Sequence, residues 1–356
     1  MAESSPTSEA KKLKMASIRD RLKPDTLLKI SFDNDGDDKN EQAPRFLVAY
    51  WSIRGLGAPL RAMLHAAQVN HEVALYDLTE APDGDSGFEM KSYAADKKWL
   101  REEYNGFMNL PFLVDSSSNL VIAQTNAIFN HLGRELNMMG NKEDVAEQAK
   151  IDEMLCEVMD LRNKLIQFSY HSDGSKGEAL ELWNRAKAHF HKFEAHLAKQ
   201  YPDYFQKMQS KEENGPKKKT SEQAKEGIAH LIPGSFTAPD FHLWEMLDQY
   251  EGLCRTFGIP LWAKEGKEQT TAVNFQSRPD VKPEDRIFPY LEEFRNSFMM
   301  LPELANYADS YLHKEIPLNN CMAKFASCYQ DFRQYQRGQE APWRAKGVVE
   351  IRYKKV

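Results

Sequence analysis

Tyr50 stands at the end of a short apolar run, where its phenol is placed to do chemistry. The run, residues 45–50, predicts a buried strand. In open α/β sheets ligands gather beyond the carboxyl ends of the strands, so this side chain is expected near a binding region. A phenol there can donate a hydrogen bond to an anion such as a thiolate, and the bond favours the charged form. The alternative is a tyrosine that only packs at a strand end.

Gln124 ends a predicted strand, residues 120–124, and Thr125 directly after it lies at the start of a predicted helix. A helix N-terminus presents unpaired N–H groups and a partial positive charge, which together can bind a carboxylate. The Thr125 hydroxyl can add one more donor. An ordinary helix cap has the same sequence, so the pattern alone allows either a carboxylate site or a simple cap.

The elements that must position these residues follow a βαβ-ββα order. Residues 45–50 and 71–76 are predicted strands, and helical spacing begins between them at Pro59. A helical segment around Trp99 precedes a hairpin and then the helix that starts at Thr125. Beyond this the spacing is helical at residues 149–168, 179–199, 239–257 and 289–298. The sequence therefore predicts an α/β domain followed by an all-α domain.

We expect four parts in the chain. Residues up to 44 are polar and rich in charge, which is typical of a flexible extension. The last residues show no clear periodic pattern. The expected parts are an extension (1–44), the α/β domain (45–138), the helical domain (143–330, with insertions near 205–232 and 263–284) and a C-terminal tail (331–356).

Composition and charge argue against several classes of protein. The chain has 356 residues, of which 41% are hydrophobic and 28% charged, as in soluble globular proteins of two or more domains. The formal net charge of -6 disfavours a nucleic-acid partner. No apolar run approaches the roughly 18 residues that a membrane span needs. With no signal-peptide pattern in the first residues, we expect a cytoplasmic protein without a membrane partner.

The cysteines and histidines predict no metal site. The four cysteines include no C-x-x-C pair, so neither a zinc site nor a redox dithiol is indicated. His189, His191 and His196 share one predicted helix, but their spacing does not place three ligands on one face. We expect reduced thiols and no bound metal.

Three motifs of the chain resemble those of mu-class cytosolic glutathione transferases, and they occur in the same order as in that family. Ala49-Tyr-Trp-Ser-Ile-Arg-Gly-Leu56 is similar to the family's first strand and turn. Asn109-Leu-Pro111 is similar to its cis-proline segment, and Gln124-Thr-Asn-Ala-Ile128 to its glutathione-binding turn. The resemblance runs with gaps from about Phe46 to Phe325. It implies a thioredoxin-like domain followed by an all-helical glutathione transferase domain.

The resemblance also implies roles for individual residues. Tyr50 would stay protonated and stabilise the glutathione thiolate for attack on a hydrophobic electrophile. Tyr170 would lie at the second-substrate site, and Phe107 would insert into the partner subunit of a homodimer. Glutathione would be the co-substrate. The implied glutathione-binding residues are Trp51, Leu56, Trp99, Asn109, Leu110, Pro111, Gln124, Thr125 and Asp160.

One departure from the family pattern affects the expected site. Many relatives have a lysine four residues after the position of Trp99, and it pairs with the glycyl carboxylate of glutathione; Glu103 stands there in this chain. Lys98 or Arg101 could take over that pairing. A non-catalytic protein of the same fold, such as a ligand carrier or an assembly module, is therefore the alternative.

Overall fold

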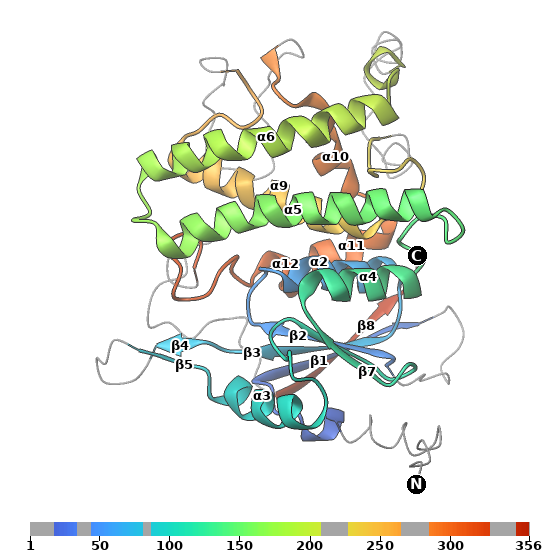
Figure 1. Cartoon of the computed structure of the whole chain (residues 1–356), viewed down its shortest axis with the longest axis vertical. Helices are drawn as coiled ribbons and strands as arrows, with labels where there is room; N and C mark the ends of the chain where they lie inside the picture. The colour runs from blue at the N-terminus through green and yellow to red at the C-terminus, as the bar shows by residue number, and fades with distance from the viewer. Residues whose placement is uncertain are drawn as a thin grey trace. The chain divides into compact units, whose positions relative to one another are not determined.

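The computed structural model describes residues 18–33, 44–80, 87–207, 227–264, 285–327 and 347–355. The chain divides into two compact units (Figure 1). Unit 1 consists of Met1–Leu136 and Asn306–Val356, and unit 2 of Asn137–Ala305. Unit 1 is therefore formed by two stretches of chain that are far apart in the sequence.

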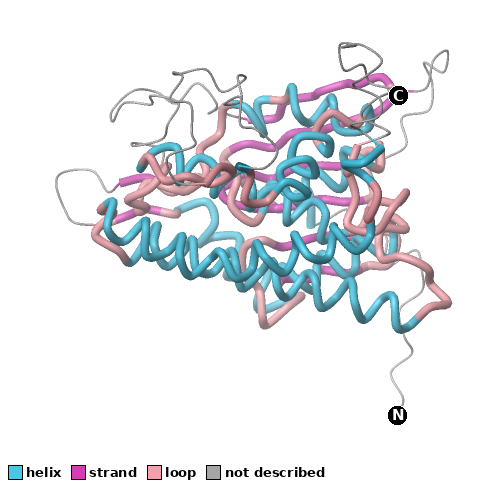
Figure 2. The backbone as a smooth tube through the Cα atoms, turned by 90° about the horizontal axis from the view of Figure 1, so that it is seen from above, coloured by secondary structure: helices cyan, strands magenta, loops and turns pink. Residues whose placement is uncertain are grey.

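Unit 1 is built on a six-stranded mixed sheet with the strand order β7-β6-β2-β3-β1-β8. The strands of the chain are the magenta segments in Figure 2. Two pairs, β2 with β3 and β1 with β8, are parallel, and the other neighbours are antiparallel. The strands are β1 (Thr26–Asp33), β2 (Phe46–Trp51), β3 (His71–Tyr76), β6 (Phe112–Asp115), β7 (Leu120–Ala123) and β8 (Gly347–Lys354). The short strands β4 (Thr79–Glu80) and β5 (Phe88–Glu89) form a separate ribbon.

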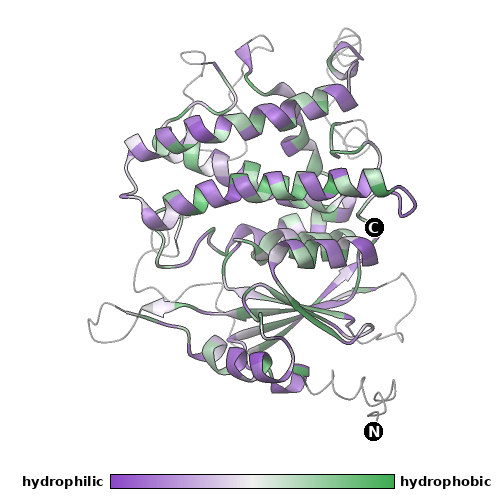
Figure 3. Cartoon of the chain, viewed as in Figure 1, coloured by the Kyte–Doolittle hydropathy of each residue, from purple (hydrophilic) through white to green (hydrophobic). Residues whose placement is uncertain are grey.

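Helices cover both faces of this sheet. Helices α2 (Gly57–Ala66) and α4 (Thr125–Glu135) lie on one face and α3 (Lys91–Glu103) on the other (Figure 1). The inner strands β2, β3 and β6 are correspondingly apolar, as Figure 3 shows, and every residue of β3 is buried. A strand covered on both sides needs apolar residues throughout, which is why these strands read as continuous apolar runs. The predicted thioredoxin-like βαβ-ββα order is confirmed.

The prediction of a flexible extension over residues 1–44 is wrong where the structure describes it. Residues 18–21 are helical and 26–33 form β1, with Leu28, Ile30 and Phe32 buried on one side of the strand. The predicted tail, residues 331–356, likewise contains β8, whose register pairs Thr26 with Gly347 and runs in parallel to the end of both strands. In both strands, more and less buried residues alternate with the period of two that a strand requires. The polar residues on either side of each strand hide this pattern in the sequence. Residues 1–17, 34–43, 328–346 and 356 lie outside the described ranges.

The predicted end of the helical domain at residue 330 is also wrong, because residues from 306 onward belong to unit 1. The reason is a set of hydrogen bonds to the turn after β2. The backbone N–H of Arg54 donates to Pro317 O at 2.7 Å, and that of Gly55 to Leu318 O at 3.1 Å. The Tyr307 hydroxyl donates to Ala58 O at 3.1 Å. The short helix α12 (Tyr311–Lys314) lies in this returning segment.

Unit 2 is helical in its described residues, as the spacing predicted. Its helices are α5 (Val145–His171), α6 (Lys176–Gln200), α9 (Ala238–Phe257) and α10 (Pro289–Phe298), and α11 (Pro302–Asp309) crosses into unit 1. Polar and apolar residues alternate along α5 and α6 (Figure 3), because each helix buries one side. Buried aromatic rings of Trp183, Phe190, Tyr250 and Phe288 contact one another in the core. Most of both predicted insertions, at 208–226 and 265–284, lies outside the described residues.

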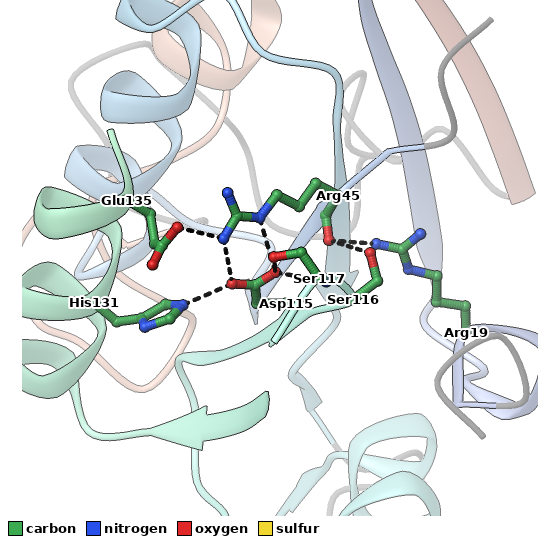
Figure 4. A network of polar contacts seen from close by, with 7 residues as sticks. All are labelled: Arg19, Arg45, Asp115, Ser116, Ser117, His131 and Glu135. Atoms are coloured by element: carbon green, nitrogen blue, oxygen red, sulfur yellow. Dashed lines mark hydrogen bonds and ion pairs between the residues drawn. The ribbon is translucent and has the colours of Figure 1, made fainter. Parts of the chain in front are cut away.

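The Asp115 carboxylate joins the end of β6 to the segment before β2 and to α4 (Figure 4). Asp115 is fully buried and accepts two hydrogen bonds from Arg45, both at 2.9 Å, and one from His131 Nε2 at 2.9 Å. The Ser117 hydroxyl donates to it at 2.8 Å. Burial alone would raise the pKa of Asp115, but the bonds from His131, Arg45 and Ser117 outweigh burial and lower the pKa. The carboxylate is therefore ionised and fully hydrogen-bonded.

Replacing Asp115 by alanine is expected to lower the free energy of unfolding by about 3 kcal/mol, because buried charge-assisted hydrogen bonds are lost. Urea denaturation at neutral pH measures the difference. The control is Asp309→Ala, which removes an ion pair with Lys314 in which the aspartate side chain is 79% exposed. That variant is expected to change stability by less than about 1 kcal/mol. Equal effects of the two substitutions would contradict the assignment.

Candidate functional site

The Tyr50 side chain lies at the end of β2 and packs against two glycines of the following turn. A methyl group on Gly55 would lie 2.8 Å from Tyr50 Cε1 and 2.9 Å from its hydroxyl oxygen. A methyl on Gly57 would lie 2.7 Å from Tyr50 Cδ1. Tyr50 is 5% exposed, and no residue in the described ranges forms a hydrogen bond with its hydroxyl. The glycines thus give the ring its place, and the hydroxyl keeps its donor capacity.

The turn that carries these glycines is fixed from two sides. The Ser52 N–H donates to Tyr76 O at 2.8 Å, which ties the turn to the end of β3. The bonds from Arg54 and Gly55 to the returning segment, residues 317–318, hold its other side. Gly55 has a φ of 37°, a conformation that glycine adopts without steric cost. Leu56, half-buried, is the N-cap of α2. The backbone around Tyr50 is therefore held by hydrogen bonds within unit 1.

A second group of predicted site residues meets around Tyr93, which the sequence analysis did not single out. The Leu110–Pro111 peptide bond is cis, as the resemblance implied. The Tyr93 hydroxyl donates to Asn109 Oδ1 at 3.3 Å, and its ring packs edge-on against Trp51, with 5.1 Å between ring centroids. Burial raises the pKa of Tyr93 to about 12, and a hydrogen bond from the Leu110 backbone acts in the opposite direction. The structure thus brings Trp51, Asn109 and Leu110 together through Tyr93.

Gln124 adopts a backbone conformation that is unusual for a residue with a side chain. Its φ is 75° and its ψ is 115°, and it is the N-cap of α4 without a side-chain capping hydrogen bond. Such conformations cost roughly 1–3 kcal/mol and cluster at functional sites. Because no side chain caps it, the first turn of α4 leaves backbone N–H groups available, as a carboxylate site requires. Thr125 is 7% exposed at the first position of the helix.

Trp99 and Glu103 are engaged with other parts of the chain. Trp99 Nε1 donates to Asp96 Oδ1 at 3.2 Å. Arg21 lies over the Trp99 ring, 4.0 Å from its centroid, and pairs with Glu103. Arg21 belongs to no motif and lies within residues 1–44, for which the sequence predicts a flexible extension. No spacing rule could have connected residues 82 positions apart.

A groove of about 560 Å³ runs along α3, on the side next to the one that carries Trp99 and Glu103. Lys98 and Arg101, the two candidates for pairing with a glycyl carboxylate, both line it. Tyr93 forms part of its wall, so the groove reaches the residue that contacts Asn109. The remaining lining residues are Met90, Ala94, Lys97, Glu102 and Gly106. Three cationic side chains make this groove suitable for an anionic group.

The other predicted residues lie apart from this group. Phe107 is 82% exposed in the loop after α3. Asp160, exposed, and Tyr170, half-buried, lie on α5 in unit 2. Their predicted roles in glutathione and second-substrate binding stay predictions.

In the described ranges no group of three or more histidine, cysteine or acidic side chains is arranged to hold a metal ion. The helix α6 histidines have separate partners: His189 bonds Glu157 at 2.6 Å, and His196 bonds Leu231 O at 2.9 Å. Of the helices the structure describes, none combines the length and apolarity that crossing a membrane requires.

Comparison with known proteins identifies the part of the chain that carries this site. Residues 47–134 match the family model "Glutathione S-transferase, N-terminal domain". The chain is 32% identical over 133 residues to "Glutathione S-transferase Y1" of Cricetulus longicaudatus, a match that covers 36% of this chain and 55% of that protein. It is 34% identical over 133 residues to "Glutathione S-transferase Mu 3" of Homo sapiens, covering 36% and 53% of the two chains. The chain spans about half the length of the curated relatives it matches.

Solved structures extend the likeness of fold beyond that domain. The Pi-class glutathione S-transferase of Onchocerca volvulus has a TM-score of 0.50 and 20% identity, covering 79% of this chain and all of that one. The glutathione S-transferase Blo t 8 has a TM-score of 0.53 and 17% identity, covering 79% and 99%. At this identity the likeness shows the two-domain fold alone. Residues 47–134 thus match the N-terminal domain of glutathione S-transferases, within a chain that has the two-domain fold of those solved structures.

Proposed function

We propose that the chain is a glutathione transferase in which Tyr50 stabilises the thiolate of bound glutathione. The observation that carries the proposal is the Tyr50 hydroxyl, which is held at the end of β2 by the glycine turn and forms no hydrogen bond with any described residue. A free thiol has a pKa of about 8.5, so only a few per cent is ionised at neutral pH. A phenol that donates to the sulfur favours the anion and lowers that pKa.

The rest of the tripeptide has matching partners in unit 1. The N-terminus of α4, at Gln124 and Thr125, would bind the γ-glutamyl carboxylate. The backbone of Leu110 would pair with the cysteinyl residue. Lys98 and Arg101, which line the groove beside α3, would attract the glycyl carboxylate in place of the family lysine. Trp51 and Asn109 would complete the site through their contacts with Tyr93.

The reaction needs no further chemistry from the chain than binding, orientation and thiolate stabilisation. The sulfur attacks an electrophilic carbon, which forms the carbon–sulfur bond and expels the leaving group. We further propose that the second substrate is hydrophobic, that Tyr170 donates to its developing charge, and that the protein is a cytoplasmic homodimer. In that dimer Phe107 would contact the partner subunit and Asp160 would reach its glutathione. The high exposure of Phe107 supports such a contact.

The test is glutathione binding by calorimetry together with conjugation of glutathione to an aryl halide, both with the full chain. We expect binding and turnover above the uncatalysed rate. A chain that neither binds glutathione nor conjugates it would overturn the proposal.

The second candidate is a non-catalytic protein of the same fold. It is favoured by the pairing of Glu103 with Arg21 and of Trp99 with Asp96, because both residues occupy positions that bind glutathione in the resembling family. Binding of glutathione without turnover of any aryl halide would support this second function.

A further inference from the structure

Residues 21–25, which we call the N-terminal strap, run along one side of α3. The α3 residues that they contact are Ser92, Asp96, Trp99 and Glu103. These positions are spaced by four, three and four residues, so they share one face of the helix. The strap runs antiparallel to the helix, with its later residues near the start of α3 and its earlier ones near the end.

At the start of α3 the strap is anchored by Asp25. Its carboxylate accepts a hydrogen bond from the Ser92 hydroxyl at 2.8 Å and one from the backbone N–H of Asp77 at 2.7 Å. Asp77 directly follows β3. One side chain therefore ties the first turn of α3 to the end of a central strand.

In the middle of α3 the anchor is Asp96, which is 2% exposed. The backbone N–H of Lys23 donates to Asp96 Oδ2 at 2.8 Å, as does the Tyr76 hydroxyl at 2.8 Å. Trp99 Nε1 donates to the other oxygen at 3.2 Å. A buried carboxylate needs such donors, so the strap backbone helps to satisfy it.

At the end of α3 the contact is made by the Arg21 side chain. Its two terminal nitrogens bond the two Glu103 oxygens at 2.6 and 2.7 Å, a bidentate pair. The same guanidinium lies over the Trp99 ring. Ile18 and Leu22 are buried in the hydrophobic core that contains Leu100. The strap is thus both packed and hydrogen-bonded.

The adjacent face of α3 belongs to the candidate glutathione site. Tyr93 contacts Trp51 and Asn109, and the basic groove is lined by residues of this helix. A shift or fraying of α3 would therefore move the residues proposed to bind the cysteinyl and glycyl parts of glutathione. Tyr50, by contrast, packs against the glycine turn.

We propose that the N-terminal strap is a positioning element, which fixes α3 as one wall of the glutathione site and so sets the affinity for glutathione. The proposal rests on the function proposed above. It assigns Glu103 to the strap, as the partner of Arg21, and explains why this position is not a lysine. Because coupling between two sites is reciprocal, bound glutathione should in turn protect the strap and α3 from opening.

The test compares the full native chain with Arg21→Glu and with the charge-swapped double variant Arg21→Glu/Glu103→Arg. Arg21 and Glu103 are 41% and 44% exposed, so these substitutions leave the core intact. We expect Arg21→Glu to raise the dissociation constant for glutathione by about fivefold, through the lost pair, the lost ring contact and the new repulsion. The rate at saturating glutathione should change less than about twofold. Because an arginine at position 103 would itself attract the glycyl carboxylate, the double variant is judged by the amide exchange of α3 and not by its affinity for glutathione.

Amide hydrogen exchange of α3 gives a readout that is independent of glutathione. We expect faster exchange in Arg21→Glu than in the native chain, and recovery in the double variant. The matched control is Arg185→Glu, which breaks an exposed ion pair with Glu181 on α6. It should change neither the dissociation constant for glutathione nor the amide exchange of α3. Unchanged exchange in Arg21→Glu, or faster exchange with unchanged affinity, would overturn the positioning role. A native chain that does not bind glutathione would overturn the proposed function, whatever the exchange shows, and the affinity role of the strap with it.

Discussion

Replacing Tyr50 by phenylalanine is expected to lower kcat/KM for conjugation of glutathione by about 100-fold at pH 6.5, while glutathione is still retained. The reason is the pKa of the glutathione thiol. A hydrogen bond that lowers this pKa by about two units stabilises the thiolate relative to the thiol by about 2.7 kcal/mol. Without the hydroxyl, the bound thiol should ionise near its free value. The ring of phenylalanine still fits against Gly55 and Gly57, so the site should keep its shape.

The pH dependence makes this prediction specific. The native profile of kcat/KM should level off about two units lower in pH than the profile of Tyr50→Phe, so the two should approach each other above pH 8.5. The control is Tyr353→Phe on β8, a half-buried tyrosine whose ring contacts Phe32. It should leave the profile unchanged. Superimposable profiles for the native chain and Tyr50→Phe would mean that another group stabilises the thiolate.

Acid is expected to destabilise unit 1 through a buried pair of histidines. His65 and His71 are both fully buried, with ring centroids 4.9 Å apart. Each Nδ1 lies 2.8 Å from a backbone carbonyl, of Arg61 and Val69 respectively, and so carries the proton. Neither Nε2 atom has a hydrogen-bond partner among the described residues, and the rings are packed against Phe32. A proton added to either Nε2 would therefore be a buried charge without a partner.

The direction of the pH effect follows from the pKa values. Burial lowers the pKa of His71 to about 4, and burial and the neighbouring His71 lower that of His65 well below its usual 6.5. The unfolded chain takes up these protons near pH 6.5 and the folded chain does not, so stability is lost as the pH falls from about 6.5 towards 4. From pH 7 to 5 the loss should be about 2 kcal/mol for each histidine.

Urea denaturation at pH 7 and pH 5 measures this loss. Replacing His71 by glutamine should reduce the difference between the two pH values by about 2 kcal/mol, even if the variant is less stable at both. His171→Gln, at the exposed end of α5, serves as the control and should leave the difference nearly unchanged. If His71→Gln and the native chain lose the same stability between pH 7 and 5, other groups cause the acid sensitivity.

The inner sheet and the long helices could be predicted because their signals are local. The apolar run 71–76 coincides with β3, and residues 289–298 coincide with α10. Strands β1 and β8 had a local signal as well, since Leu28, Ile30 and Phe32 of β1 alternate with polar residues, and β8 has the same pattern. What the sequence could not supply was the pairing of β1 with β8, because the two strands are more than 300 residues apart and either would be unstable alone.

In the candidate site, too, residues that belong to local motifs could be predicted, and contacts with distant segments could not. Tyr50, Leu110, Pro111 and Gln124 could be predicted because each belongs to a short motif whose geometry is local. The cis peptide and the unusual φ of Gln124 are features of those motifs themselves. The surroundings of Glu103 could not be predicted, because its partner Arg21 comes from a segment with no motif of its own. Contacts between distant side chains depend on the whole fold, and these contacts decide how α3 is held.

The pairing of β8 with β1 has a consequence for the growing chain on the ribosome. The sheet of unit 1 is complete only after the last residue of β8 has been made, because β8 covers the outer side of β1. From residue 34 to residue 354 the ribosome adds 321 residues, which takes roughly 15–65 s at about 5–20 residues per second. During that time any β1 that has already paired with β3 carries an open strand edge, the kind of surface at which chains associate with one another.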